Sequence, residues 1–382
     1  MAGHDPITGE IRWTYTRSNL DMCVMGSGDT DAPGITLGGA VRGVMVGYVK
    51  SGKCSELTLL NPVTGERRYQ RTGFTAADST LVWGGPYGGL VSDDLLEVWR
   101  NDLVRTIQYG NQPEPTKPNT KHLGCTFADV ALAATQLGTV EHCQDQPNAQ
   151  LVLNFDDPGA SPDGRSNNWD ALNHDPRASV DLGSASARLL AVSKDSALVL
   201  VASPEPAVVL YSDTGVEQSR IPIGIDAAQV AAADANRVTP VRISGGIRYA
   251  LVGTTLLAID DRLGVSWTMP DVLGLPAVVG SDLLVPVGDG LAVVGSATGT
   301  TSRVIPVDRA GYVGRVDAGT VGGTVVESRG ELVVALRDPA APATDDAIES
   351  ADRTHQSGIR LPSAAPNTAV TQATETVGTF EP

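Results

Sequence analysis

The sequence predicts an all-β fold, a seven-bladed β-propeller with four strands in each blade. Three observations lead to this prediction: a recurring strand-turn-strand phrase, complementary half-repeats at the two ends, and a composition suited to short strands. Of the 382 residues, 42 are glycine and 24 are proline, and only 19% are charged. Many short strands joined by tight turns have this balance, whereas long amphipathic helices are hard to find.

The recurring phrase is an apolar strand, a turn of the Asp/Asn-x-x-(Thr)-Gly type, and a more polar strand. Its clearest copy runs from Leu57 to Tyr69, with Gly65 at the turn. Glycine adopts the positive φ that such a turn needs without a Cβ clash. Further copies begin at Val208, Leu256 and Leu291, and more divergent ones at Leu96 and Leu151. With two strands upstream, each unit spans roughly 40 to 57 residues, which is typical of propeller blades.

The two ends of the chain look like halves of one blade. Residues Glu331–Pro339 form a copy of the apolar strand without an outer strand, and Asp5–Tyr15 form a turn and outer strand with nothing before them. We therefore predict that Thr8–Thr16 pairs with Glu331–Leu336 and closes the ring. The propeller would span residues 1–339. Residues 340–382, rich in Ala, Thr, Pro and acidic residues, are predicted to be a disordered tail.

Four cysteines form an even and well-separated set, which favours disulfides in an exported protein. Cys23 and Cys125 lie near the start of a blade's first strand, whereas Cys54 and Cys143 lie at the end of the second strand. These ends are neighbours in an antiparallel pair. The topology therefore predicts Cys23–Cys54 and Cys125–Cys143, one of three possible connectivities.

Charge and motifs exclude several kinds of function. A formal charge of -16 argues against nucleic-acid binding, which needs clustered Lys and Arg. The histidines have no metal-ligand spacing, and no cysteine pair has the CxxC spacing of a zinc site. Gly26-Ser27-Gly28 lacks the strand-to-helix context of a serine nucleophile. The five histidines that lack metal-ligand spacing are His4, His122, His142, His174 and His355. We therefore predict no catalytic residue, no metal and no cofactor.

The longest irregular insertion, Asp156 to Pro176, is rich in Asp and Asn. Oxygen ligands this dense would suit calcium, but the spacing of a calcium-binding loop is absent, which favours a solvated loop. Long loops on a rigid scaffold are nevertheless where binding residues concentrate.

Aromatic residues are scarce, so those in or beside Gly/Pro/Asn-rich segments are informative. Trp83, Tyr87, Asn168 and Trp169 are predicted to bind a ligand, because an aromatic ring beside polar groups suits a sugar or glycolipid. The alternative for Trp83 is packing between blades, and it is the one we favour. Outer-strand aromatic residues at equivalent positions after the turn are predicted to pack between blades as well: Trp13, Tyr69 and Trp267.

The phrases Asp5-Pro6-Ile7-Thr8-Gly9-Glu10-Ile11-Arg12-Trp13 and Asn61-Pro62-Val63-Thr64-Gly65-Glu66 resemble the repeat of quinoprotein-like (PQQ-like) propellers. The resemblance covers roughly residues 5–339 and is weak between Asp102 and Ser186. Within that family the chain looks most like membrane-anchored, extracytoplasmic propellers of mycolic-acid bacteria, the polar growth factor proteins. These work beside the transporter of trehalose monomycolate. The resemblance implies a periplasmic protein tethered to the inner membrane through a missing N-terminal segment.

The leading hypothesis is therefore a non-enzymatic propeller of the cell envelope, with an envelope glycolipid and/or an inner-membrane lipid transporter as its partner. One alternative is a protein-protein scaffold for envelope assembly, and another is an unrecognised periplasmic enzyme. A contiguous apolar groove would favour lipid binding and a polar rim would favour the scaffold. A deep pocket with paired carboxylates or a metal would favour the enzyme.

Overall fold

The computed structural model describes residues 1–5, 8–27, 43–85, 87–100, 102–112, 122–133, 136–154, 177–232, 237–321, 323–330, 332–336 and 358–360. Within these residues lie seven four-stranded antiparallel sheets and one two-stranded sheet. The seven-bladed propeller predicted from the repeats is confirmed. The described part of the chain contains no helix long and apolar enough to cross a membrane.

The blades follow one another along the chain. Blade 1 is β3 (Met22–Ser27), β4 (Val44–Lys50), β5 (Lys53–Leu60) and β6 (Arg67–Thr72). Blade 2 is β7 (Thr80–Gly84), β8 (Tyr87–Val91), β9 (Leu95–Arg100) and β10 (Arg105–Gly110). Blade 3 is β11 (Cys125–Leu132), β12 (Leu137–Cys143), β13 (Gln150–Asn154) and β14 (Ala178–Asp181). Blade 4 is β15 (Ala187–Val192), β16 (Ser196–Val201), β17 (Ala207–Ser212) and β18 (Glu217–Pro222).

The short helix α1 (Ala227–Ala232) connects blade 4 to blade 5. Blade 5 is β19 (Val241–Ser244), β20 (Ile247–Val252), β21 (Thr255–Ile259) and β22 (Val265–Met269). Blade 6 is β23 (Ala277–Val279), β24 (Asp282–Val287), β25 (Gly290–Gly295) and β26 (Thr301–Pro306). Blade 7 is β27 (Val316–Val321), β28 (Thr324–Arg329), β29 (Leu332–Leu336) and β30 (Gly358–Arg360). The two-stranded sheet pairs β1 (Ala2–His4) with β2 (Ile11–Thr14).

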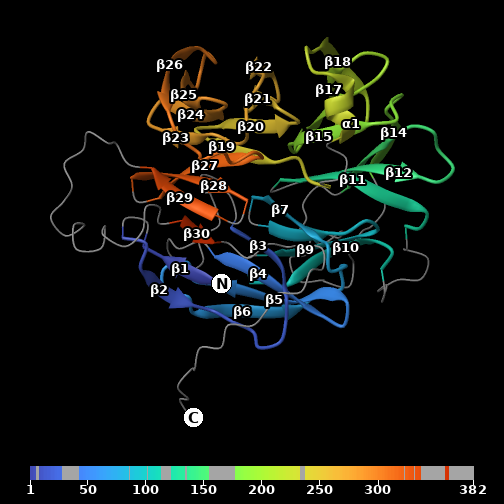
Figure 1. Cartoon of the computed structure of the whole chain (residues 1–382). Coiled ribbons are helices and arrows are strands. Elements are labelled where there is room, and N and C mark those ends of the chain that lie inside the picture. The colour runs from blue at the N-terminus through green and yellow to red at the C-terminus, as the bar shows by residue number, and fades with distance from the viewer. Residues whose placement is uncertain are drawn as a thin grey trace.

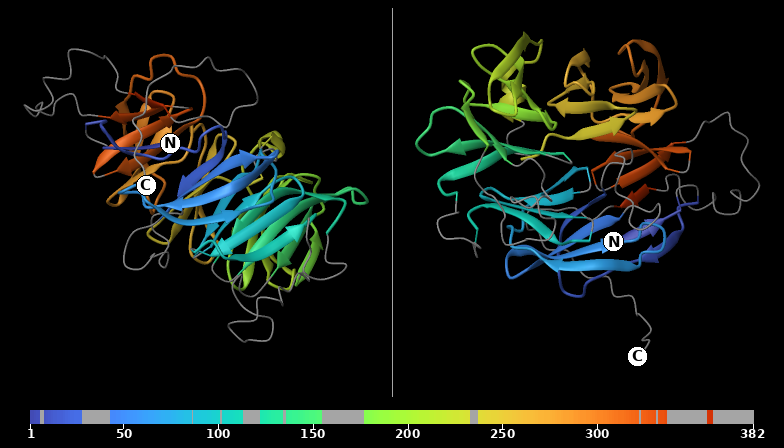
Figure 2. Two further views of the ribbon diagram at one scale, coloured as in Figure 1. Left: turned by 90° about the horizontal axis from the view of Figure 1, so that it is seen from below. Right: turned by 180° about the vertical axis from the view of Figure 1, so that it is seen from behind.

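The blades succeed one another around a ring, from blade 1 at the bottom of Figure 1 through blades 4 to 6 at the top and back through blade 7. Figure 2 shows the same succession from below and from behind. Every predicted copy of the apolar strand coincides with the third strand of a blade, from β5 to β29. The outer strands β6, β18 and β26 are exposed along their whole length, whereas β8, β15 and β21 are buried throughout. The core therefore lies within and between the blades.

The predicted closure of the ring is wrong in its strand pairing. β29 pairs with β30, which comes from residues 358–360, and β2 pairs with β1 instead of with β29. Closing a short hairpin costs little conformational entropy. The two N-terminal strands therefore pair with each other, with Ala2 opposite Thr14. Three residues of the predicted tail thus belong to blade 7. The remainder of residues 340–382 lies outside the described residues, so its disorder stays a prediction.

The N-terminal hairpin covers the side of blade 1 that faces away from blade 2. Met1, Trp13 and Tyr15 pack against a buried cluster formed by Val46, Tyr48 and Leu60. The Tyr15 hydroxyl lies 3.2 Å from the Thr58 hydroxyl. The opposite side of blade 1 packs against blade 2 through a separate cluster. Figure 1 accordingly places β1 and β2 beside blade 1, on the side of β29 and β30.

One joint recurs between neighbouring units: an outer-strand side chain rests on the turn glycine of the next blade. Trp267 lies against Gly299 and donates from Nε1 to the Ser296 carbonyl at 2.9 Å. Trp13 lies against Gly65 and donates to the Pro62 carbonyl at 3.0 Å. The predicted inter-blade packing is confirmed for Trp267, whereas Trp13 packs between the N-terminal hairpin and blade 1. Tyr69 differs, because 41% of its surface is exposed on β6.

Replacing Gly65 with alanine should destabilise the fold more than the same change at Gly52. Both glycines have positive φ, +72° and +75°, so both variants bear a backbone penalty of about 1 kcal/mol. A Cβ at Gly65 would also lie 2.6 Å from the Trp13 ring, whereas nothing lies within 4 Å of one at Gly52. Displacing the ring should add about 1 to 3 kcal/mol, measured by chemical denaturation. An equal loss of unfolding free energy in the two variants would show that the contact between Trp13 and Gly65 does not stabilise the fold.

Both predicted disulfides, Cys23–Cys54 and Cys125–Cys143, are confirmed. Cys125 and Cys143 face each other directly across β11 and β12. Cys54, however, lies at the start of β5 and not at the end of the second strand, so its disulfide passes over β4. Gly47 of β4 makes room, because a Cβ there would lie 3.0 Å from Cys54 Sγ. Two disulfides fit an extracytoplasmic protein.

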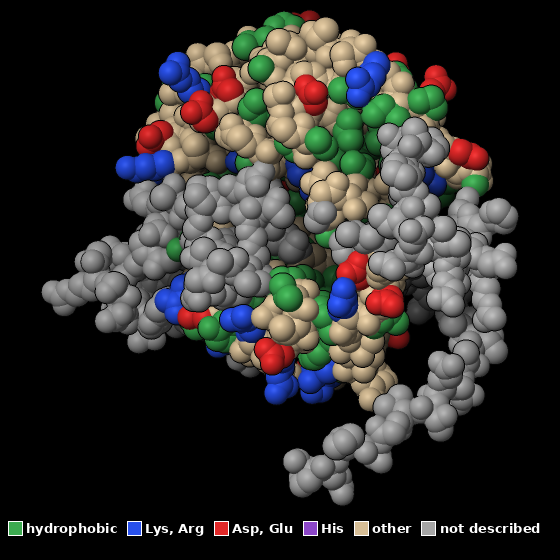
Figure 3. Space-filling view, turned by 90° about the vertical axis from the view of Figure 1, so that its left-hand side faces the viewer, with side chains coloured by type: hydrophobic (Ala, Val, Ile, Leu, Met, Phe, Trp, Pro, Cys, Tyr) green, Lys and Arg blue, Asp and Glu red, His purple; other side chains and the backbone are tan. Residues whose placement is uncertain are grey.

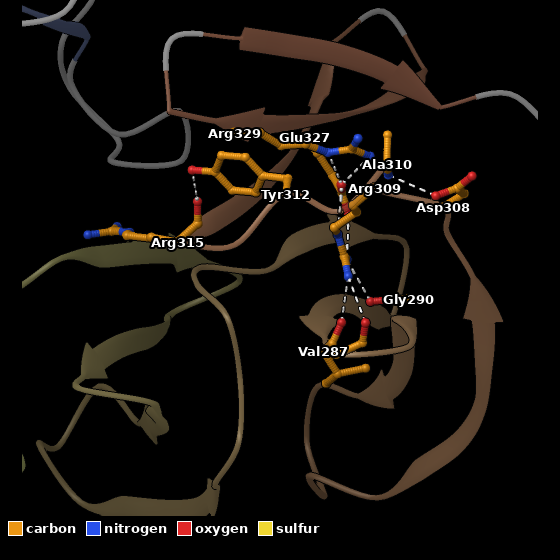
Figure 4. A network of polar contacts seen from close by, with 10 residues as sticks. Val287, Gly290, Asp308, Arg309, Ala310, Tyr312, Arg315, Glu327 and Arg329 are labelled. Atoms are coloured by element: carbon orange, nitrogen blue, oxygen red, sulfur yellow. Dashed lines mark hydrogen bonds and ion pairs between the residues drawn. The ribbon is translucent and has the colours of Figure 1, made fainter.

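A buried arginine joins blades 6 and 7 (Figure 4). Arg309 donates to the Val287 and Gly290 carbonyls of blade 6, at 2.6 and 2.8 Å. Its guanidinium also pairs with Glu327 of blade 7 at 2.8 Å, and Glu327 is completely buried and pairs with Arg329 as well. Because one side chain satisfies polar groups on two blades, it fixes their relative position.

Candidate binding groove

A groove lies between the outer parts of blades 1 and 2, with a cavity of about 550 Å³. Its walls come from the outer strand β6, from the segment that follows it, and from the outer strand β10. It is lined by Gln70, Arg71, Thr72, Phe74 and Arg105. The outer strand β6 is exposed along its whole length, whereas β10 is buried apart from the half-buried Arg105 at its start, and the resulting lining is mostly polar and cationic.

The aromatic ring of Phe74 lies close to two cations. The Arg105 guanidinium carbon is 5.5 Å from the ring centroid and Lys53 Nζ is 5.9 Å from it. At these distances the negative face of the ring attracts both cations. Phe74 therefore gives the groove an apolar surface beside positive charge.

A buried carboxylate fixes the arrangement. Glu97 of β9 is completely buried and accepts hydrogen bonds from Arg105 Nη1 at 2.9 Å and Gln108 Nε2 at 3.1 Å. Its other oxygen accepts the Phe74 backbone N–H at 2.6 Å. A buried charge needs such partners, and these orient both Arg105 and the loop that carries Phe74.

Positive charge concentrates on this side of an acidic protein. The strand β6 reads Arg67-Arg68-Tyr69-Gln70-Arg71-Thr72 and is exposed throughout. Within the described residues, Arg68 and Arg71 have no carboxylate partner. On the face seen in Figure 3, Lys and Arg side chains gather at the lower end, the end at which Figure 1 draws β6. The cationic edge is therefore local and available to an anionic ligand.

One acidic side chain lies nearby, but its charge is already compensated. Glu56 is mostly buried and pairs with Lys50 at 2.9 Å and with Arg17. The hydrogen bond from Lys50 and the charges of Lys50 and Arg17 lower the pKa of Glu56. Gln70, which lines the groove, also donates to this carboxylate at 3.4 Å. The Arg17 contact fastens the segment after the N-terminal hairpin to blade 1.

Of the residues predicted to bind a ligand, the two that the structure describes, Trp83 and Tyr87, do not line this groove. Trp83 of β7 is half-buried against the cluster between blades 1 and 2, in agreement with the packing alternative. Tyr87 is only 7% exposed and packs in the core of blades 2 and 3, so it offers little surface to a ligand. Asn168 and Trp169, with the whole of Asp156–Pro176, lie outside the described residues, and their roles in ligand or calcium binding stay predictions.

Part of the groove could have been found in the sequence. The run Arg67-Arg68 with Arg71 follows a recognisable turn, which marks it as an exposed outer strand. Phe74 and Arg105 give no such signal, since they meet only when blade 2 packs on blade 1. Glu97 is harder still, because a charged residue between Leu96 and Val98 is typical of a strand with one solvated face.

No protein-family model matches the chain, and no curated protein matches it. Similar solved structures include BamB from Moraxella catarrhalis, with 13% identity, 88% of this chain and 78% of that chain covered, and a TM-score of 0.37. The computationally designed protein Ika8 has 11% identity, coverage of 77% and 83%, and a TM-score of 0.44. BBS1N, solved in complex with ARL6DN, has 11% identity, coverage of 82% and 94%, and a TM-score of 0.42.

Proposed function

We propose that the protein is a non-enzymatic interaction propeller of the extracytoplasmic space, and that the groove between blades 1 and 2 binds an acidic segment of a partner protein. The cationic lining of the groove carries this proposal: Arg71 and Arg105 line it together with Phe74, and Glu97 holds Arg105 in place. Carboxylates would pair with the guanidinium groups, while an aliphatic stem would cover the Phe74 ring. The two disulfides support the location.

The groove favours a protein scaffold over a lipid carrier. A mycolate chain needs a long apolar surface, at roughly 0.8 kcal/mol per buried methylene, and the described residues that line the groove offer one apolar ring. Trehalose monomycolate is uncharged and gains little from arginines. The resemblance implies an inner-membrane lipid transporter as the partner. Such a transporter would fit this proposal if an acidic segment of it entered the groove.

The glycolipid hypothesis depends on Asn168 and Trp169. If it holds, Trp169→Ala should weaken binding of trehalose monomycolate with little change in the melting temperature. Unchanged affinity would remove that loop from the site.

A peptide titration tests the proposal. A labelled hexaglutamate peptide should bind the wild-type protein at low salt, and Arg71→Gln should weaken binding roughly three- to tenfold. Added salt should weaken it too, because screening shortens the reach of exposed charges. The readout is fluorescence anisotropy, with a hexaglutamine peptide as the uncharged comparison.

The matched control is Arg303→Gln. Arg303 is exposed on β26, the outer strand of blade 6, and its loss changes the net charge of the protein by the same amount. Binding to Arg303→Gln should equal binding to the wild type. Equal weakening in both variants would mean general charge attraction and would contradict a site, as would no binding by the wild type.

A further inference from the structure

Four side chains that are metal ligands elsewhere in proteins meet at one end of blade 3. They are His122, Cys125, Glu141 and Cys143, and their ligand atoms all lie within 4.8 Å of one another. The cysteines are joined as a disulfide in this structure, so their sulfurs are not free to bind a metal.

The strand register brings the four together. Cys125 faces Cys143, and Phe127 faces Glu141, so Glu141 and Cys143 lie two residues apart on one face of β12. His122 approaches from the segment before β11, and its Nε2 lies 2.6 Å from Glu141 Oε2. The ring of Tyr109 stacks on the imidazole at 5.1 Å between centroids and orients it. Glu141 itself is completely buried.

The two disulfides differ in their access to solvent. Cys23 and Cys54 are 5% and 0% exposed, whereas Cys125 and Cys143 are half-buried at the edge of blade 3. Thiol-disulfide exchange needs a thiolate to reach a sulfur atom. A dithiol reductant should therefore open Cys125–Cys143 first.

We propose that reduction of Cys125–Cys143 converts this cluster into a zinc site with two sulfur, one nitrogen and one oxygen ligand. The dithiol is oxidised to its own disulfide as the protein S–S bond breaks, and both electrons pass to Cys125 and Cys143. The two thiols then lose their protons to solvent when Zn²⁺ binds. His122 and Glu141 supply the remaining ligands, completing a tetrahedral set at bond lengths of about 2.0 to 2.3 Å.

The arrangement needs only small local movements. Two sulfurs bound to one zinc lie about 3.8 Å apart, given Zn–S bonds of about 2.3 Å. Cys125 and Cys143 lie directly opposite each other on β11 and β12, so their side chains can reach this separation once the disulfide is reduced. Opposing strand residues already hold the two sulfurs on one side of the sheet. The site is independent of the groove, which lies between blades 1 and 2.

Metal titration of the reduced protein tests the proposal. The protein is reduced with dithiothreitol, and the reductant is then removed under anaerobic conditions. The reduced protein is titrated with Zn²⁺, or with Co²⁺ as a spectroscopic probe. We expect one metal ion per chain and a thiolate-to-cobalt charge-transfer band in the reduced protein, and neither in the oxidised protein. Cys125→Ser should lose the band, and His122→Gln should lower the affinity at least tenfold.

Two comparisons keep the test decisive. His142 precedes Cys143 in the chain, but the His142 side chain is not part of the cluster. The metal affinity of His142→Gln should therefore equal that of the wild type. If reduction alone loosens the fold, zinc should restore the near-ultraviolet circular dichroism. No metal bound after reduction, equal binding to oxidised protein, or wild-type affinity in His122→Gln would each overturn the proposal.

Discussion

Replacing Arg309 with methionine should lower the free energy of unfolding by about 3 to 5 kcal/mol, the typical loss when one partner of a buried ion pair is removed. Methionine fills similar space but donates no hydrogen bonds. The Val287 and Gly290 carbonyls of blade 6 would lose their donor, and Glu327 of blade 7 would keep only Arg329. The measurement is equilibrium unfolding in urea.

Arg315→Met is the matched control. Arg315 lies in the same connection between blades 6 and 7 and pairs with Asp317 at 3.0 Å, but 44% of its side chain is exposed. An exposed pair contributes less than about 1 kcal/mol. Similar losses in the two variants would show that Arg309 does not join the blades in the way its contacts indicate.

Removing the Cys23–Cys54 disulfide should cost about 3 kcal/mol, because a cross-link over 31 residues restricts the unfolded chain. The double variant Cys23→Ala/Cys54→Ala also leaves a void beside Gly47, where the sulfur atoms now pack. Thermal unfolding should show the loss under non-reducing conditions.

Dithiothreitol at a concentration that opens only the half-buried Cys125–Cys143 disulfide should leave the stability difference between the wild type and the double variant unchanged. A double variant as stable as the wild type would contradict the structural role of the buried disulfide.

The blades could be predicted from the sequence because each one repeats the same local chemistry. The apolar third strand and the turn residue at positive φ depend on neighbours in the chain, as Gly65, Gly215 and Gly299 show. Trp13 is instructive in a different way. It makes the same contact with a turn glycine as Trp267, so its packing was predictable although the pairing of its strand was not. A strand of four residues carries little register information of its own.

The groove depends on contacts between blades, and these leave weaker traces. The arginines of β6 are visible as a basic run, but Phe74 and Arg105 become neighbours only through the packing of blade 2 on blade 1. The same reason hides the cluster at blade 3, because His122 and Glu141 come from different segments without zinc-ligand spacing. Conversely, Tyr87 beside a glycine-rich turn looks exposed in the sequence and is buried by blade 3.

The location of the bound acidic segment tests the central claim most directly. A hexaglutamate peptide carrying a photoreactive group would be cross-linked to the protein at low salt and the modified residues mapped by mass spectrometry. The groove predicts cross-links within β6, at Phe74 and its neighbours, and within β10, and their loss in Arg71→Gln but not in Arg303→Gln. Cross-links spread over the outer strands of the other blades, or unchanged in Arg71→Gln, would contradict it.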